Sequence, residues 1–242
     1  MHLYYDFHIH TGLSPCGDAD MTPNNIVNMA LIKELDAIAI TDHNTCGNAD
    51  AVMAVARDTE GAPLVLPGME VESAEETHII CLFPDLKAAK TFETVVQDSL
   101  PNLKNRKEIF GNQYFFDEDD NIVGEEERLL LTASGLDIYT IVNTVKQLGG
   151  IAYPAHIDRS SYSVLSSLGF IPGDLDINIV EISKASDPAV YIEKNSRLIK
   201  PDCDFVQSSD AHYLENISER ERFIELNTPL SAENVINALR AL

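Results

Sequence analysis

The sequence predicts an α/β fold that forms one domain around a mostly parallel sheet or barrel. Apolar strand-like runs alternate with helical patterns along most of the chain, which is typical of repeated βα units. Residues of the metal-binding type follow several of these runs, as they would on the C-terminal rim of a barrel. A chain of 242 residues with 45% hydrophobic residues can bury such a core undivided.

The expected elements alternate in order from the N-terminus. Residues 3–8 are an apolar strand, and Thr22-Pro23 opens a helix that extends to about Leu35, because Thr caps helices well and Pro suits the first turn. Gly61 closes a helix over residues 50–60. Further strands are expected at residues 37–41, 64–70, 78–83, 151–154, 179–183, 204–208 and 223–226, and further helices from Ser160, over 188–199 and from Ser231.

Residues 84–135 interrupt this alternation and are expected to be an insertion. A helix-like stretch extends to about Leu100, and residues 110–116 and 121–131 then flank an acidic turn, which predicts a hairpin. Two interpretations remain open. The insertion is either a surface elaboration or a cap over the site that restricts the size of the substrate.

Charge and cysteine content exclude some classes of partner. The formal net charge of −22 makes a grip on nucleic acid unfavourable and favours small substrates, although solubility alone would also explain it. The cysteines Cys16, Cys46, Cys81 and Cys203 have no Cys-x-x-Cys spacing, so neither disulfides nor a zinc ribbon are predicted. Without a signal peptide or a membrane-spanning run, a cytoplasmic protein without membrane contact is expected. The oligomeric state is left open.

Six of the seven histidines lie where a multinuclear metal site would need them. His8 and His10 are two residues apart at the end of a strand, so a period of two points both rings to one side. His43 follows a second strand-like run, and Asp210 and His212 follow a third. The remaining two candidates are His78 and His156.

The candidate ligands combine imidazoles with carboxylates. His8, His10, Glu70 and Asp210 offer two nitrogens and two carboxylates, a set that suits zinc, manganese or iron. If Glu70 bridges two ions, His78 and His156 complete a second site, and His43 and His212 with one more donor make a third. Two or three divalent ions are therefore expected. Asp6 and Asp42 are expected to orient neighbouring imidazoles, with a turn or cap role as the alternative.

Taken together, these motifs resemble the PHP (polymerase and histidinol phosphatase) family of metal-dependent phosphoesterases. The resemblance rests on Asp6-Phe-His8-Ile-His10, Thr41-Asp42-His43-Asn44, Gly68-Met-Glu70, His78, Pro154-Ala-His156 and Ser209-Asp210-Ala-His212. It spans nearly the whole chain. It implies a distorted (βα)7 TIM-like barrel with three metals at the C-terminal ends of the strands: one on His8, His10, Glu70 and Asp210, one on Glu70, His78 and His156, and one on His43 and His212.

The chain departs from the family pattern at two places. A further ligand for the third metal usually follows the first motif, as His or Asp, whereas here Cys16, Asp18 and Asp20 compete for that role. Cys16 is preferred, and a thiolate would favour zinc, while either carboxylate would favour manganese or iron. Ile157 stands where many members have a proline after the histidine.

The expected function is hydrolysis of a small phosphate monoester by a metal-activated hydroxide. Histidinol phosphate, a nucleotide or a nucleoside bisphosphate would each suit such a site. His156, His212 and Asp210 are the expected catalytic residues, and His156 or His212 would protonate the leaving oxygen. Arg159 and Lys184 are expected to bind the phosphate. The alternatives are a 3′–5′ exonuclease, an amidohydrolase-like enzyme and a non-catalytic metal-bound sensor.

Overall fold

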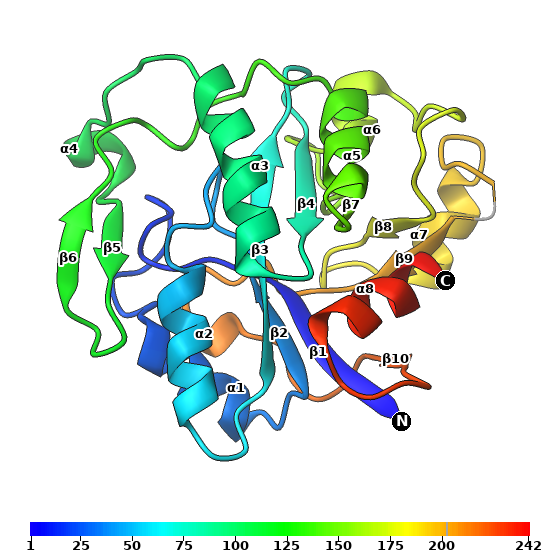
Figure 1. Ribbon diagram of the computed structural model, residues 1–242. Coiled ribbons are helices and arrows are strands. Elements are labelled where there is room, and N and C mark those ends of the chain that lie inside the picture. Colours follow the sequence, from blue (N-terminus) through cyan, green and yellow to red (C-terminus); the bar gives the residue numbers. More distant parts are fainter. Residues whose placement is uncertain (202) are drawn as a thin grey trace.

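A curled six-stranded sheet lies at the centre of the protein, with helices against it (Figure 1). The computed structural model describes residues 1–201 and 203–242. The sheet has the order β10-β1-β2-β3-β4-β7, and two smaller sheets are formed by β5-β6 and β8-β9. The strands are β1 (His2–Ile9), β2 (Ala37–Ile40), β3 (Leu64–Glu72), β4 (His78–Leu82), β5 (Tyr114–Phe116), β6 (Ile122–Glu125), β7 (Ile151–Pro154), β8 (Ile179–Glu181), β9 (Asp204–Val206) and β10 (Phe223–Glu225). The helices are α1 (Pro23–Ile32), α2 (Ala49–Asp58), α3 (Leu86–Ser99), α4 (Lys107–Phe110), α5 (Ile138–Gln147), α6 (Val164–Leu168), α7 (Pro188–Asn195) and α8 (Ala232–Arg240), with a short 3-10 turn at Leu214–Asn216.

The sheet is mixed, whereas the sequence predicted a mostly parallel one. Strands β1, β2 and β3 are parallel, but β4 is antiparallel to both β3 and β7, and β10 is antiparallel to β1. Only residues 73–77 separate β3 from β4. A link of that length can make a hairpin but cannot make the crossover that a parallel pair needs.

The curl brings the six-stranded sheet and the β8-β9 sheet together at two places. The Ile157 amide donates to the Glu181 carbonyl at 2.9 Å, which links the end of β7 to β8. On the other side, a parallel bridge pairs Ile9 with Ala211, which follows β9. The described residues therefore form a mixed α/β fold with a curled sheet, and the closed (βα)7 barrel remains a prediction.

Alternating side chains along the strands divide the core into two clusters. Leu3, Tyr5 and Phe7 of β1 belong to a cluster that also contains Val235 and Leu239 of α8. The larger cluster joins the opposite side chains of the strands to α1, α2, α3 and α5. Within the described part of the chain, no helix has the length and apolar composition needed to cross a bilayer.

Helix α5 is an element that the sequence analysis did not predict. Asp137 caps it by accepting a hydrogen bond from the Thr140 amide at 2.7 Å. Its buried side chains are Ile138, Ile141, Val142 and Val145, spaced as on one face of a helix. Both the cap and the spacing were readable in the sequence.

The segment that precedes α5 contains the antiparallel hairpin β5-β6, which packs on the loops after β1 and β2. The Tyr114 amide donates to the Gly12 carbonyl at 2.9 Å. Asn48, in the loop after β2, holds strand β5 in place, because its side chain donates to the Tyr114 carbonyl at 3.0 Å and accepts from the Phe116 amide at 3.0 Å. At Gly47, an added Cβ would lie only 2.5 Å from the Phe115 ring. The hairpin therefore rests against the two loops that follow His10 and His43.

Asn48→Ala should lower the free energy of unfolding by about 2 kcal/mol, because it leaves buried backbone groups of β5 without partners. Urea denaturation followed by circular dichroism measures this loss. Asn143→Ala on the exposed face of α5 is the matched control, with an expected change below about 0.5 kcal/mol. Equal losses in the two variants would contradict the bridging role of Asn48.

Candidate metal centre

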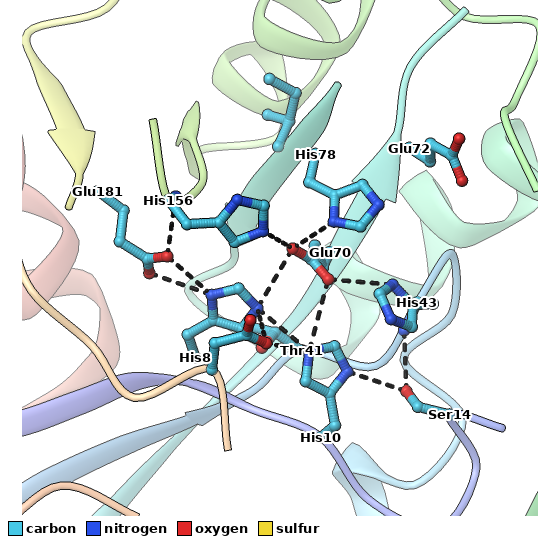
Figure 2. Close-up of polar contacts among 12 residues, drawn as sticks. His8, His10, Ser14, Thr41, His43, Glu70, Glu72, His78, His156 and Glu181 are labelled. Carbon is cyan, nitrogen blue, oxygen red and sulfur yellow. Dashed lines mark hydrogen bonds and ion pairs between the residues drawn. The ribbon is translucent and has the colours of Figure 1, made fainter. Parts of the chain in front are cut away.

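The candidate ligands meet at one edge of the curled sheet (Figure 2). His8 lies near the end of β1, His43 follows β2 and Glu70 lies in β3. His78 begins β4, and because β4 is antiparallel to β3, its first residue lies at the edge where β3 ends, opposite Glu72. The ligands that come later in the chain follow β7 and β9: His156, Asp210 and His212.

Glu70 is the centre of this arrangement, and its side chain is 1% exposed. Its Oε1 atom lies 2.9 Å from His78 Nδ1, 3.1 Å from His156 Nε2 and 3.3 Å from His8 Nε2. Its Oε2 atom lies 3.0 Å from His43 Nδ1 and 3.4 Å from His10 Nε2. One buried carboxylate thus faces five imidazoles, which is the geometry expected of a bridging ligand.

Among the described residues, three groups of donor atoms are compact enough to hold an ion. His8, His10, Glu70 and Asp210 form one group, the same four residues that the sequence analysis assigned to the first metal. The other groups differ from the expected sets, because His43 joins Glu70 and His78, and His10 joins His43 and His212. The expected second set was Glu70, His78 and His156. Within this set, His156 contacts the Glu70 carboxylate at 3.1 Å. How ions divide among these ligands remains a prediction.

The donors fit divalent cations. The ring nitrogens His8 Nε2 and His10 Nε2 face each other at 3.1 Å, and only one hydrogen can lie between them. The same nitrogens lie 3.2 and 3.1 Å from Asp210 Oδ1. Buried carboxylates and converging nitrogen lone pairs need a compensating positive charge, which a divalent ion supplies.

The surrounding charges prepare these groups to act as ligands. Burial acts to raise the pKa of Glu70, but His78, His8 and His43 together hold it well below its usual value. The pKa of Asp210 is also lowered, because His8 and His10 outweigh its burial. Burial, with nearby His212 and His43, keeps the pKa of His10 well below its usual value. The carboxylates are therefore ionised and His10 is neutral near pH 7, as metal binding requires.

Glu181 orients the first ligand, and the sequence analysis missed it. Its Oε1 atom lies 2.9 Å from His8 Nδ1 and accepts from the His156 amide at 3.1 Å. Its carboxylate also holds the pKa of His8 well above the usual value, against the effect of burial. The available signal was its position in a predicted strand, at residues 179–183.

Asp6 and Asp42 make different contacts. Among the described residues, the Asp6 carboxylate contacts no imidazole nitrogen. It accepts from the amides of Ser209 and Ser218 at 2.9 and 2.8 Å, which corresponds to the alternative turn role and holds the loop of Asp210. Asp42 acts through Ser14, whose hydroxyl donates to Asp42 at 2.7 Å and lies 3.0 Å from His10 Nδ1.

Among the described residues, Cys16 is the one of the three competing donors whose side chain contacts the imidazole of an expected ligand. Its Sγ atom lies 3.1 Å from His212 Nε2. Although burial raises the pKa of this thiol, His43 and His212 lower it to about 6. The Asp18 carboxylate instead accepts from the Asp20 amide at 2.9 Å. These contacts favour Cys16 over Asp18 as the residue that would bind a metal together with His43 and His212.

The two expected phosphate-binding cations lie in different surroundings. Arg159 Nη1 lies 2.5 Å from Asp210 Oδ2 and lines a cavity of about 110 Å³ above the donors. The Lys184 ammonium instead donates to the Asn216 carbonyl at 3.0 Å and lies outside the lining of this cavity. The structure therefore brings Arg159, but not Lys184, to the metal centre.

The backbone around the centre is unusual at several ligand positions. His156 has a φ of 29° and Asp210 a φ of 52°, both in the left-handed region that residues with a Cβ rarely adopt. Tyr162, with a φ of 55°, stacks on His78 with ring centroids 5.0 Å apart. Ile157 needs an amide hydrogen for its bond to Glu181, which explains why a proline would not serve here.

Glu181→Gln should weaken metal binding by about tenfold or more, because the amide cannot supply the negative charge that strengthens His8 as a ligand. Titration against a competing chelator measures the affinity. Glu225→Gln is the control, since Glu225 is 58% exposed and pairs only with His2 among the described residues. Unchanged affinity in folded Glu181→Gln would exclude the orienting role.

Cys16→Ala should lose one equivalent of metal, whereas Asp18→Asn should retain all of it, because the Cys16 thiol contacts the His212 ring and the Asp18 residue contacts His212 through its backbone amide. Elemental analysis after dialysis gives the metal content of each variant. The opposite result, with loss in Asp18→Asn alone, would transfer the ligand role to the carboxylate.

The chain is similar to a protein family and to several solved structures. The model of the PHP domain family matches residues 6–229. A search of curated proteins gives no match. Among solved structures, a lesion-specific endonuclease from Pyrococcus furiosus is 18% identical with a TM-score of 0.68, and the match covers 100% of this chain but only 56% of that one.

Two further structures match along nearly their whole length. A protein from Bifidobacterium adolescentis, assigned to the metal-dependent phosphoesterases, is 16% identical with a TM-score of 0.61, and the match covers 97% of this chain and 95% of that one. An amidohydrolase from Chromobacterium violaceum is 15% identical with a TM-score of 0.53, covering 90% and 91%. At these identities the likeness concerns the fold. The family model, which matches residues 6–229 and includes all the candidate ligands, shows that the chain belongs to the PHP domain family of metal-dependent hydrolases.

Proposed function

We propose that this protein is a phosphoesterase that hydrolyses a small phosphate monoester. The observation that carries the proposal is the cavity of about 110 Å³ in which one guanidinium, Arg159, faces the buried donors. The size suits a phosphate group, and the lining combines ligands for cations with the positive charge of Arg159. Phosphoryl transfer requires such positioning and charge neutralisation more than it requires covalent chemistry by the protein.

Divalent ions held by these residues would lower the pKa of a water molecule and neutralise charge on the phosphoryl oxygens. Arg159 adds hydrogen bonds in a fixed fork, which matches two oxygens of a phosphate. Its side chain is 46% exposed, so it can turn from Asp210 toward an incoming ester. Tyr162 also lines the cavity and stacks on His78.

If it is not bound to a metal, His212 is the better placed of the two candidate proton donors to the leaving oxygen. Its side chain is 22% exposed, whereas that of His156 is 2% exposed and faces Glu70. Burial lowers the pKa of His212, but Cys16 and Asp210 raise it above the usual value, so the ring can hold a proton near neutral pH. Asp210 contributes by holding His8, His10 and Arg159 in place.

The test is phosphate release by zinc- or manganese-loaded protein across histidinol phosphate, mononucleotides, nucleoside bisphosphates and short oligonucleotides. We expect turnover of at least one small monoester that a chelator abolishes, and a loss of about 100-fold in kcat/KM in Arg159→Ala. Arg197→Ala, at an exposed position of the chain, is the control. Release from oligonucleotide ends alone would favour a nuclease, cleavage of amides alone an amidohydrolase, and complete inactivity with metal bound a sensor.

A further inference from the structure

A second cavity adjoins the metal centre on the side of Cys16. It has a volume of about 300 Å³, and its lining includes Cys16, Asp18, Asn112, Tyr114 and Tyr213. The two cavities are neighbours, because Cys16 lines the second cavity, His212 lines the phosphate-sized one, and these two side chains are in contact at 3.1 Å. Both side chains are accessible to solvent, so a group attached to a phosphate at the centre can extend over them into the second cavity.

The segment expected to be an insertion builds one wall of this cavity. Gly111, Asn112 and Tyr114 come from that segment, and the opposite wall is the loop that carries Cys16. The walls touch so closely that a Cβ on Gly111 would lie 2.1 Å from the Pro15 carbonyl oxygen, and the φ of Gly111 is +100°. The Tyr114 amide also donates to the Gly12 carbonyl at 2.9 Å. The wall is therefore held at a fixed distance from the metal centre.

The chemistry of the lining distinguishes between possible leaving groups. Tyr114 and Tyr213 offer ring faces and phenol groups, and Asn112 an amide. Asp18 adds a carboxylate, which accepts hydrogen bonds and attracts positive charge. Among the residues that line it, none is a lysine or arginine. A second phosphate would therefore meet negative charge without a compensating cation, in a chain whose net charge is −22.

We propose that this second cavity receives the leaving group of the ester and selects a planar group that is uncharged or cationic and carries hydrogen-bond donors. Aromatic rings favour stacking against planar groups, and the carboxylate favours donors. The segment at residues 84–135 then acts as a selectivity wall, which corresponds to the cap interpretation of the sequence. This inference rests on the proposed phosphoesterase function, since it assigns the phosphate to the neighbouring cavity.

The test compares esters with chemically equivalent leaving oxygens. In the metal-loaded protein, kcat/KM for 2-phenylethyl phosphate should exceed that for n-butyl phosphate by about tenfold or more, as expected for an aromatic group in a fitted pocket. Adenosine 5′-monophosphate should likewise be preferred to adenosine 3′,5′-bisphosphate by about tenfold. Equal rates within each pair, or a preference for the bisphosphate, would overturn the proposal.

Variants assign the preference to the wall. Tyr213→Ala and Tyr114→Leu should each reduce the ratio between the phenylethyl and butyl esters to about threefold or less. Tyr139→Ala on α5 is the matched control, because Tyr139 is a partly exposed tyrosine outside the lining, and it should keep the full ratio. If Tyr213→Ala and Tyr114→Leu both fold and both keep the full ratio, the tyrosines do not form the leaving-group site.

Direct binding separates this proposal from the proposed function. Saturation-transfer NMR with 2-phenylethanol and adenosine, which carry no phosphate, should detect binding to the metal-loaded protein and its loss in Tyr213→Ala. Absence of turnover on every ester together with this binding would overturn the phosphoesterase function and retain the cavity. Turnover of esters without such binding and without a preference would retain the phosphoesterase function and overturn the leaving-group cavity.

Discussion

The burial of the Glu70 carboxylate is the constraint on which the rest of the site depends. A buried negative charge is costly unless positive charge or hydrogen bonds compensate it. Five imidazoles approach Glu70 from strands and loops that are far apart in the sequence, so the carboxylate sets where those strands must end. The raised pKa of His8 supplies positive charge when no ion is bound. Because an imidazole must be neutral to act as a ligand, cations would take over the balance of Glu70 and Asp210 in the metal-bound site.

The ligands and most strands could be predicted because their signals are local. A His-x-His pair at the end of an apolar run and a lone histidine after another run are visible without knowledge of the fold. Helix α5 was equally visible from Asp137 and its apolar spacing, and overlooking it was an error of interpretation. The family model agrees with the motifs that carried the resemblance.

What could not be predicted depends on how distant segments meet. The antiparallel direction of β4 follows from its hairpin with β3, and that direction explains how His78, the first residue of a strand, reaches the other ligands. Glu181 becomes important only because the curl of the sheet places β8 between β7 and β9, from where its carboxylate reaches His8 of β1. Lys184 follows the same strand as Glu181, but its ammonium group donates to the Asn216 carbonyl and not to a group at the metal centre. The spacing of residues along the chain cannot predict which of two distant partners a side chain will contact.

The left-handed backbone at His156 and Asp210 has a thermodynamic consequence. Each such conformation costs on the order of 1 kcal/mol in a residue with a Cβ, and that energy can be released if the loop relaxes. Both residues are candidate ligands, so the cations that they would bind also hold the strained loops in place. Metal loading and local folding are then a single coupled equilibrium at this edge of the sheet. A chelator would accordingly act as a local denaturant of these loops, and the centre would be both the most reactive and the most easily opened part of the chain.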